Sequence, residues 1–335
     1  MSKKVVLSGY YGFKNFGDEA ILSLLVNKLK AVNCDITVIS ANSEYTKTLY
    51  NDIRTVKTFD ITSIIKAILK SDILISGGGS LLQDVTSLKS LIYYLFVIFI
   101  ALILKKRVVI FAQGIGPINN KLGQLLTKNL LKHCYYISVR DDNSAELLSN
   151  WGIKSEVVPD PVFSVPIEKI DKNKILGIQL RDCKAMNDLF LNNLADFVIS
   201  HFKGYNIEIY SLQDSIDLPV CNKFESLIKD KFNVKVYSEM SHKQVINSIN
   251  SCEYLISMRL HSIITGLLSG VKTASINYDI KVKKLADEFN LPVFELNKAP
   301  ENQYNELYEE DIDAVLDKLN DKKFNWDKFY SEIFA

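Results

Sequence analysis

Residues 257–262, Ser-Met-Arg-Leu-His-Ser, place a guanidinium and an imidazole where a strand is predicted to meet a helix. The apolar run Tyr254–Ser257 predicts a buried strand, and the apolar run Ile263–Leu268 predicts a helix directly after it. A helix N-terminus favours an anion, so we expect Arg259 to bind one there. An imidazole exchanges a proton near neutral pH, which makes His261 a candidate acid–base catalyst. The alternative for this histidine is a structural role.

Two further cations follow predicted strands. Arg140 comes at the end of the strand Tyr135–Val139, and its planar fork suits bidentate binding of phosphate or carboxylate. Its alternative is an ion pair with Asp141 or another buried acid. Lys281 follows the strand Thr273–Ile276 near a helix start, where it could act as a point charge for phosphate. Its alternative is a solvated surface lysine.

A glycine-containing loop at residues 9–19, Gly-Tyr-Tyr-Gly-Phe-Lys-Asn-Phe-Gly-Asp-Glu, follows the predicted strand Val5–Ser8. Glycine permits positive φ and a close approach of the backbone to a ligand. Asn15 or Asp18 is a candidate cap for the following helix. The loop matches neither the dinucleotide fingerprint nor the P-loop, and its alternative is a capped turn without a ligand.

Two other loops also come at strand ends. Gly78 and Gly79 belong to a Ser-Gly-Gly-Gly-Ser run that is expected to lead into a helix and to present backbone N–H groups to an anion. A tight crossing from strand to helix is the alternative. Gln113 opens the run Gln-Gly-Ile-Gly-Pro, which we expect to line the wall of a crevice or to form a simple turn.

The elements that must position these residues alternate between strand and helix throughout the chain. We expect an α/β protein with a GT-B-like fold, in which two doubly wound Rossmann-like domains with parallel sheets face a central cleft. The predicted domains are residues 1–165 and 172–320, joined by a proline-containing linker that begins near Val158. We expect residues 321–335 to form a helical tail that packs back on the first domain. In such sheets, ligands bind beyond the carboxyl ends of the strands.

The composition limits the function classes. A net charge of +1 over 335 residues argues against a nucleic-acid partner. The five cysteines form no CxxC pair and the four histidines have no metal-ligand spacing, so we expect reduced thiols, no metal and a cytoplasmic location.

The longest apolar run, residues 91–104, precedes Lys105, Lys106 and Arg107. It is shorter than the roughly 17–25 residues of a spanning helix. It predicts either a fully buried helix or a surface, residues 91–107, that contacts the inner face of the cell membrane.

The quoted motifs, in their order along the chain, resemble the polysaccharide pyruvyl transferase family. The resemblance covers residues 4–290, and the closest branch is that of the CsaB-type enzymes, which act on secondary cell-wall polymers that anchor surface-layer proteins. It implies phosphoenolpyruvate as donor, a cyclic 4,6-ketal of pyruvate on a sugar as product, and release of phosphate. The acceptor implied is N-acetylmannosamine in a lipid-linked disaccharide. Asp279-Ile280 stands where the family has a proline before the lysine.

The resemblance gives each candidate residue a role. His261 and Arg140 are predicted to be catalytic, with His261 protonating the methylene carbon of the donor. The other assignments to the donor are Arg259, Lys281, Ser262, Gly78 and Gly79. The residues assigned to the acceptor or to the lining of the cleft are Asn15, Asp18, Gln113 and Asp141. Cations that stabilise the departing phosphate make a metal or a cofactor unnecessary in this scheme.

Two rival hypotheses remain open. A nucleotide-sugar glycosyltransferase or sugar-nucleotide epimerase on the same fold would need an acid to bind ribose late in the second domain, and Glu288 or Glu295 is a candidate. A scaffold or sensor that has lost activity is the non-enzymatic alternative, and the set of cations and the histidine argue against it.

Overall fold

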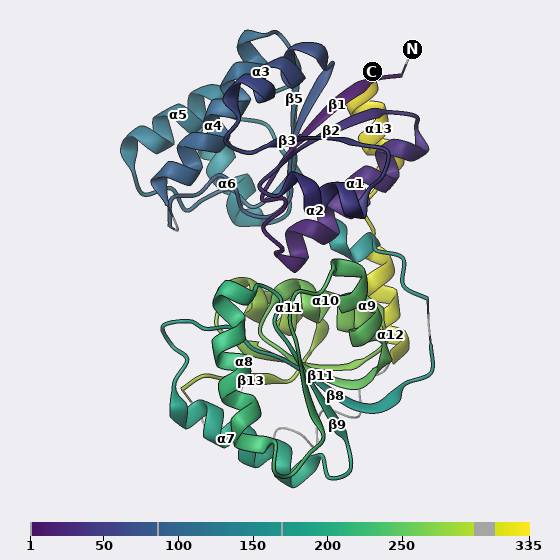
Figure 1. Cartoon of the computed structure of the whole chain (residues 1–335). Helices are drawn as coiled ribbons and strands as arrows, with labels where there is room; N and C mark the ends of the chain where they lie inside the picture. Colours follow the sequence, from purple (N-terminus) through teal and green to yellow (C-terminus); the bar gives the residue numbers. More distant parts are fainter. Residues whose placement is uncertain (1, 86, 169, 298–311) are drawn as a thin grey trace. The chain divides into compact units, whose positions relative to one another are not determined.

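The computed structural model describes residues 2–85, 87–168, 170–297 and 312–335, and it divides into two compact units. The N-terminal unit comprises Met1–Ser164 and Lys323–Ala335, and the C-terminal unit comprises Val165–Lys322. Figure 1 shows both units along the chain.

The N-terminal unit is built on a parallel sheet whose strands, within the described residues, have the order β3-β2-β1-β4-β5-β6-β7. Helices cover both faces of the sheet, so its central strands are continuous apolar runs. The strands are β1 (Lys4–Ser8), β2 (Asp35–Ser40), β3 (Arg54–Lys57), β4 (Ile73–Gly77), β5 (Arg107–Gln113), β6 (Tyr136–Val139) and β7 (Glu156–Val157).

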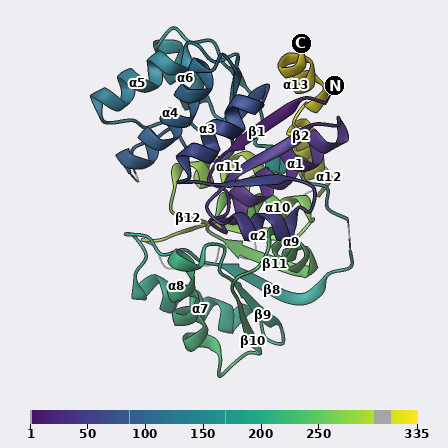
Figure 2. The same cartoon turned by 45° about the horizontal axis from the view of Figure 1, so that its top comes forward.

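The helices α3, α4 and α5 lie side by side and bury their apolar sides against one face of this sheet (Figures 1 and 2). The helices of the unit are α1 (Phe16–Ala31), α2 (Ser43–Leu49), α3 (Ile61–Lys70), α4 (Leu88–Ile103), α5 (Lys121–Leu131), α6 (Asp142–Asn150) and the short 3₁₀ helix η1 (Pro161–Ser164).

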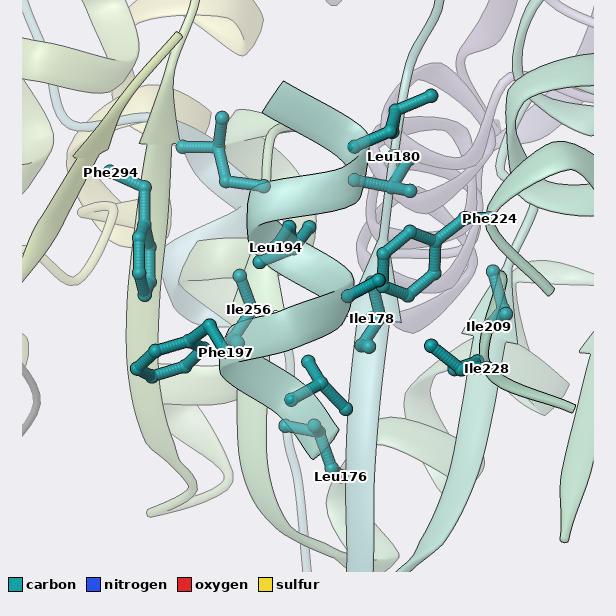
Figure 3. Close-up of a cluster of buried hydrophobic side chains, with 14 of the residues drawn as sticks. Leu176, Ile178, Leu180, Leu194, Phe197, Ile209, Phe224, Ile228, Ile256 and Phe294 are labelled. Atoms are coloured by element: carbon teal, nitrogen blue, oxygen red, sulfur yellow. The ribbon is translucent and has the colours of Figure 1, made fainter. Parts of the chain in front are cut away.

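The C-terminal unit repeats the architecture with the strand order β10-β9-β8-β11-β12-β13 in the part of the chain that is described. Figure 3 shows Leu194 and Phe197 of its first helix packed beside Ile178 and Ile256 of the sheet. The strands are β8 (Asn173–Gln179), β9 (Asn206–Tyr210), β10 (Val234–Tyr237), β11 (Cys252–Ser257), β12 (Lys272–Asn277) and β13 (Val293–Glu295). The helices are α7 (Asp188–His201), α8 (Asp214–Ile228), α9 (His242–Ser251), α10 (Leu260–Leu268), α11 (Ile280–Phe289) and α12 (Ile312–Asp321).

The C-terminal helix α13 (Trp326–Phe334) belongs to the N-terminal unit. Its Phe329 packs on Phe111 of β5 with ring centroids 4.9 Å apart. The hydroxyl of Tyr330 donates to the carbonyl oxygen of Lys28 (2.8 Å), which ties α13 to α1. The last residues of the chain therefore complete the core of its first half.

The predicted fold class is confirmed, since both units are doubly wound parallel α/β sheets. Short elements that the periodicity did not predict include α2, β3, β7 and β13. The first part of the predicted linker is not a linker: Val158–Ser164 folds into the N-terminal unit, with η1 packed on α1. The glycine run at residues 77–79 does not lead directly into a helix, because the next helix begins at Leu88.

Each sheet has one point at which the strand order reverses. In the N-terminal unit it lies between β1 and β4, and in the C-terminal unit between β8 and β11. A crevice forms at the carboxyl ends of such strand pairs because their following segments diverge to opposite sides. These two points are therefore where ligand-binding side chains are expected.

Candidate active site

At the reversal point of the C-terminal unit, Gln179 joins the ends of β8 and β11. Its side-chain oxygen accepts the backbone N–H of Arg259 (2.8 Å) and that of Met258 (3.2 Å). Its amide donates to the carbonyl oxygen of Leu180 (2.7 Å). Because Gln179 is fully buried, these bonds fix the backbone from which Arg259 projects.

Arg259 occupies the N-cap position of α10, makes no side-chain capping bond there and is 8% exposed. Its Nε and Nη2 donate to both carboxylate oxygens of Asp217 in α8 (2.8 and 2.7 Å), and Nη2 also reaches Gln213 (3.1 Å). Among the described residues, Nη1 makes no hydrogen bond, so it is the part of the guanidinium that remains for a ligand. Asp217 itself is completely buried, which makes this a bidentate buried ion pair.

Arg181 follows β8 and was not singled out from the sequence. Its guanidinium carbon lies 5.6 Å from the ring centroid of Tyr278, which follows β12. Burial raises the pKa of Tyr278, and the nearby charges of Arg181 and Arg259 oppose that rise. The positive charges of both guanidiniums therefore lie near the Tyr278 side chain at this edge of the sheet. The rule that selected Arg140, a cation after an apolar strand, would also have found Arg181.

His261 and Ser262 lie in the first turn of α10. His261 is partly exposed, whereas Ser262 is fully buried and donates to the carbonyl oxygen of Arg259 (2.8 Å) while it also bonds to Ser257. The bonds of Ser262 hold the strand–helix junction together. Its assignment to donor binding and that of His261 to catalysis remain predictions.

Lys281 lies in the first turn of α11 and is partly exposed. Asp279 caps this helix by accepting the backbone N–H of Lys281 (2.8 Å). The cap supplies the helix start that a proline would otherwise favour. Lys281 therefore begins a helix at the same edge of the sheet as Arg259, one strand farther along.

In the N-terminal unit, Arg140 follows β6 and its side chain is 8% exposed. Its Nη1 donates to Asp160 (2.6 Å), and its Nη2 donates to the hydroxyl of Ser80 (3.3 Å). Asp160 also accepts the backbone N–H of Val162 (3.0 Å). The ion pair with a buried acid, which the sequence left as the alternative, is thus present, and the catalytic role of Arg140 remains a prediction.

Asn15 caps α1 by accepting the backbone N–H of Gly17 (3.2 Å). Asp18, in the first turn, lies against Gly79, where a Cβ atom would meet its Oδ1 at 2.4 Å. Gly79 also has φ +62°, so a side chain there would be both strained and obstructed. The glycine run thus allows the carboxylate of Asp18 to approach the end of β4.

Glu19 is the titratable group whose importance the sequence did not reveal. Its side chain is 1% exposed, and its Oε1 accepts the backbone N–H of Gly12 (2.7 Å). Its Oε2 is buried without a hydrogen-bond partner among the described residues. Burial raises the pKa of Glu19 to about 7. Glu19 therefore holds the loop of residues 9–14 in place and changes charge near neutral pH.

Gln113 and Asp141 have local structural contacts. Gln113 is fully buried and donates to the hydroxyl of Ser76 (2.9 Å), while its side-chain oxygen has no partner within the described ranges. Asp141 caps α6 by accepting the backbone N–H of Ser144 (2.9 Å). No group of three or more His, Cys, Asp or Glu side chains in the described residues is arranged to hold a metal ion.

The candidates thus fall into two groups, each within one unit. Arg181, Arg259, His261 and Lys281 stand at the edge of the C-terminal sheet, and Asn15, Asp18, Glu19 and Arg140 stand at the edge of the N-terminal sheet. The sequence model of one family, polysaccharide pyruvyl transferase, matches residues 15–280. The chain belongs to the polysaccharide pyruvyl transferase family. Family membership indicates a transferase that acts on polysaccharide.

Solved structures similar to this family member share its fold at low identity. They include Anabaena HepE in complex with UDP-glucose (10% identity, TM-score 0.64, 98% of each chain covered). A glycosyltransferase from Rickettsia africae has 14% identity, a TM-score of 0.64 and full coverage of both chains. The UDP-GlcNAc 2-epimerase from Neisseria meningitidis has 11% identity and a TM-score of 0.57, with 96% of this chain and 100% of that one covered. No curated protein matches the chain.

Both candidates for the one acid that a nucleotide-sugar enzyme would need have side-chain partners in this pyruvyl transferase family member. Glu288 forms an ion pair with Lys322, and Glu295 accepts from the side-chain amide of Asn277 (3.0 Å). Neither contact favours recognition of a ribose by these residues.

Proposed function

We propose that this protein transfers the pyruvyl group of phosphoenolpyruvate to a sugar as a cyclic 4,6-ketal and releases phosphate. The observation that carries the proposal is the cationic edge of the C-terminal sheet, where Arg181, Arg259 and Lys281 follow three neighbouring strands. A donor with both a phosphate and a carboxylate needs several positive groups at short range. The family supports the pyruvyl group as the part transferred.

In this scheme, the C-terminal unit holds the donor. Nη1 of Arg259 and the side chain of Arg181 bind the carboxylate, and Lys281 binds the phosphate as a point charge. The pair with Asp217 keeps the guanidinium of Arg259 in one orientation, so little entropy is lost when the donor binds. The N-terminus of α10, directly after Arg259, adds the positive end of its helix dipole near the same anion.

His261 protonates the methylene carbon, which makes the adjacent carbon electrophilic. One sugar hydroxyl adds to that carbon and gives up its proton. The bond to the phosphate oxygen breaks, and the cations stabilise the leaving group. The second hydroxyl then adds and loses its proton, so that two new C–O bonds replace the enol double bond and the phosphate ester.

The acidic residues of the N-terminal unit suit a neutral acceptor. Asp18 and Asn15 can accept hydrogen bonds from sugar hydroxyls, and Glu19 holds the preceding loop of residues 9–14 in place. We propose N-acetylmannosamine in a lipid-linked disaccharide of a cell-wall polymer as this acceptor. The support for this choice is the resemblance of the motifs to the CsaB-type branch.

The test is incubation of the protein with phosphoenolpyruvate and a synthetic lipid-linked disaccharide, with phosphate release and product mass both measured. We expect stoichiometric phosphate and a disaccharide that has gained one pyruvyl group. UDP-sugars in place of phosphoenolpyruvate should give no product. Transfer of a sugar from a UDP-sugar, with no reaction of phosphoenolpyruvate, would refute the proposal.

A further inference from the structure

The outer side of α4 carries large apolar residues at helical spacing. Ile92, Phe99 and Ile103 are exposed, the last of them by 59%, although the opposite side of the helix is buried in the core. Spacings of four and seven residues place them on one side of the helix. The interpretation of this segment as a fully buried helix is therefore wrong, because one face of α4 lies in the core and the other is open.

The neighbouring helices extend this apolar surface. Leu69 near the end of α3 is 56% exposed, and Leu122 and Leu125 of α5 are exposed as well. Because α3, α4 and α5 lie side by side in both views (Figures 1 and 2), these residues contribute to one layer of the N-terminal unit. Phe59, just before α3, is 81% exposed and contacts Tyr93 of α4 edge-on.

The charge on this layer has one sign. No Asp or Glu occurs between Asp84 and Asp141, whereas eight Lys and Arg do. The two acids that border the layer are both engaged: Asp60 caps α3, and Asp84 accepts backbone N–H groups of Asn119 and Asn120. The exposed lysines on the three helices and at their ends are Lys66, Lys70, Lys89, Lys105, Lys121 and Lys132.

Two cations of the sequence cluster at 105–107 are not part of this surface charge. Lys106 donates to the carbonyl oxygens of Leu69 (2.8 Å) and Ser71 (2.7 Å). Arg107 reaches the carbonyl oxygen of Ile333 (3.3 Å) and lies over the ring of Tyr135. Lys105 alone of the three is exposed, so the basic character comes mainly from α3, α5 and the start of α4.

We propose that the outer layer of α3, α4 and α5 docks on an anionic lipid surface. Exposed apolar side chains can enter the boundary between headgroups and acyl chains, while the lysines around them bind acidic headgroups. A second copy of the chain fits less well, because the same basic surface would face itself. No helix in the described residues is long and apolar enough to cross a bilayer, so the layer lies on the surface.

The experiment is flotation of the full chain with vesicles, one set of equal parts phosphatidylglycerol and phosphatidylcholine and one of phosphatidylcholine alone. We expect binding to the anionic vesicles that weakens with salt, and little binding to the neutral ones. The double variant Lys66→Glu/Lys105→Glu should lower the affinity by roughly fivefold or more for each lysine changed. The matched control is Lys203→Glu/Lys231→Glu, which changes two exposed lysines of the C-terminal unit.

The apolar contribution is tested with Phe99→Ser/Ile103→Ser, against Leu189→Ser as a control at a 70% exposed leucine of the C-terminal unit. We expect loss of flotation in the double variant alone, with unchanged melting temperatures. Equal flotation with both vesicle types, no effect of these variants, or a dimer in solution that Phe99→Ser/Ile103→Ser dissociates would each overturn the proposal. Flotation is independent of turnover, so failure of the proposed reaction would leave this result unaffected.

Discussion

The two units place opposite charges at equivalent points of the same topology. Where the strand order reverses in the N-terminal sheet, the groups that converge are Asp18 and Glu19. At the corresponding point of the C-terminal sheet they are Arg181 and Arg259. A parallel sheet fixes where ligands bind but leaves the chemistry to the side chains there. The difference suits an anionic donor on one unit and a hydroxyl-bearing acceptor on the other.

The largest effect is expected from His261→Ala. Removal of a general acid typically costs a factor of about 10²–10⁴ in turnover. We expect phosphate release from phosphoenolpyruvate and acceptor to fall by that amount, while the far-UV circular dichroism and the melting temperature stay unchanged. His133→Ala, at an exposed histidine of the other unit, is the control. Turnover near the normal rate in His261→Ala would remove this residue from the mechanism.

The buried ion pairs give the next comparison. Asp217→Ala leaves Arg259 buried without its bidentate partner, which should destabilise the C-terminal unit by about 3–5 kcal/mol in urea unfolding. Asp160→Ala should cost less, because the side chain of Asp160 is 7% exposed whereas that of Asp217 is completely buried. An equal loss in both variants would mean that the complete burial of Asp217 adds nothing.

The pH dependence should differ in sign between the units. The folded-state pKa of Glu19 is raised to about 7, so this group contributes stability at low pH that is lost as the pH rises through 7. Burial lowers the pKa of His242 to about 4, so its contribution is present above the usual histidine range and is lost as the pH falls toward 4.

Glu19→Gln mimics the protonated acid and should remove the loss at high pH. The gain at pH 8 relative to the unmodified protein should be at most about 3 kcal/mol, measured by urea unfolding across the pH range. Below about pH 4, under the unfolded-state pKa of glutamate, the two proteins should be equally stable. A Glu19→Gln variant that loses stability with rising pH as the unmodified protein does would exclude Glu19 as the cause.

The smallest effect is expected for Arg181, which was not among the site residues predicted from the sequence. Arg181→Lys keeps a charge but loses the planar fork, so we expect the KM for phosphoenolpyruvate to rise by roughly tenfold with kcat little changed. Lys184→Ala, at an exposed lysine nearby in the chain, is the control. A change in kcat without a change in KM would assign Arg181 to the chemical step rather than to donor binding.

Much of this architecture could be predicted because strands and helices follow local hydrophobic periods. The strand before Arg259 and the helix after it were both expected, and Asn15 was one of the two candidates for the cap of α1. The short elements α2 and β13 were not predicted, because each has too few residues to show a clear hydrophobic period. Only the first part of the predicted linker, Val158–Ser164, was wrong, because prolines mark a break in regular structure but not the boundary of a core.

The sequence by itself determined which residues stand at the ends of strands. Those residues include the motifs that indicate the family and the cations of the candidate site. The tertiary structure alone decided which of those charges are neutralised. Asp217 is 42 positions from Arg259, and Asp160 is 20 positions from Arg140. Local periodicity cannot specify such partners, because they are set by packing between distant elements. The burial of Glu19 and the open side of α4 were decided by that same packing.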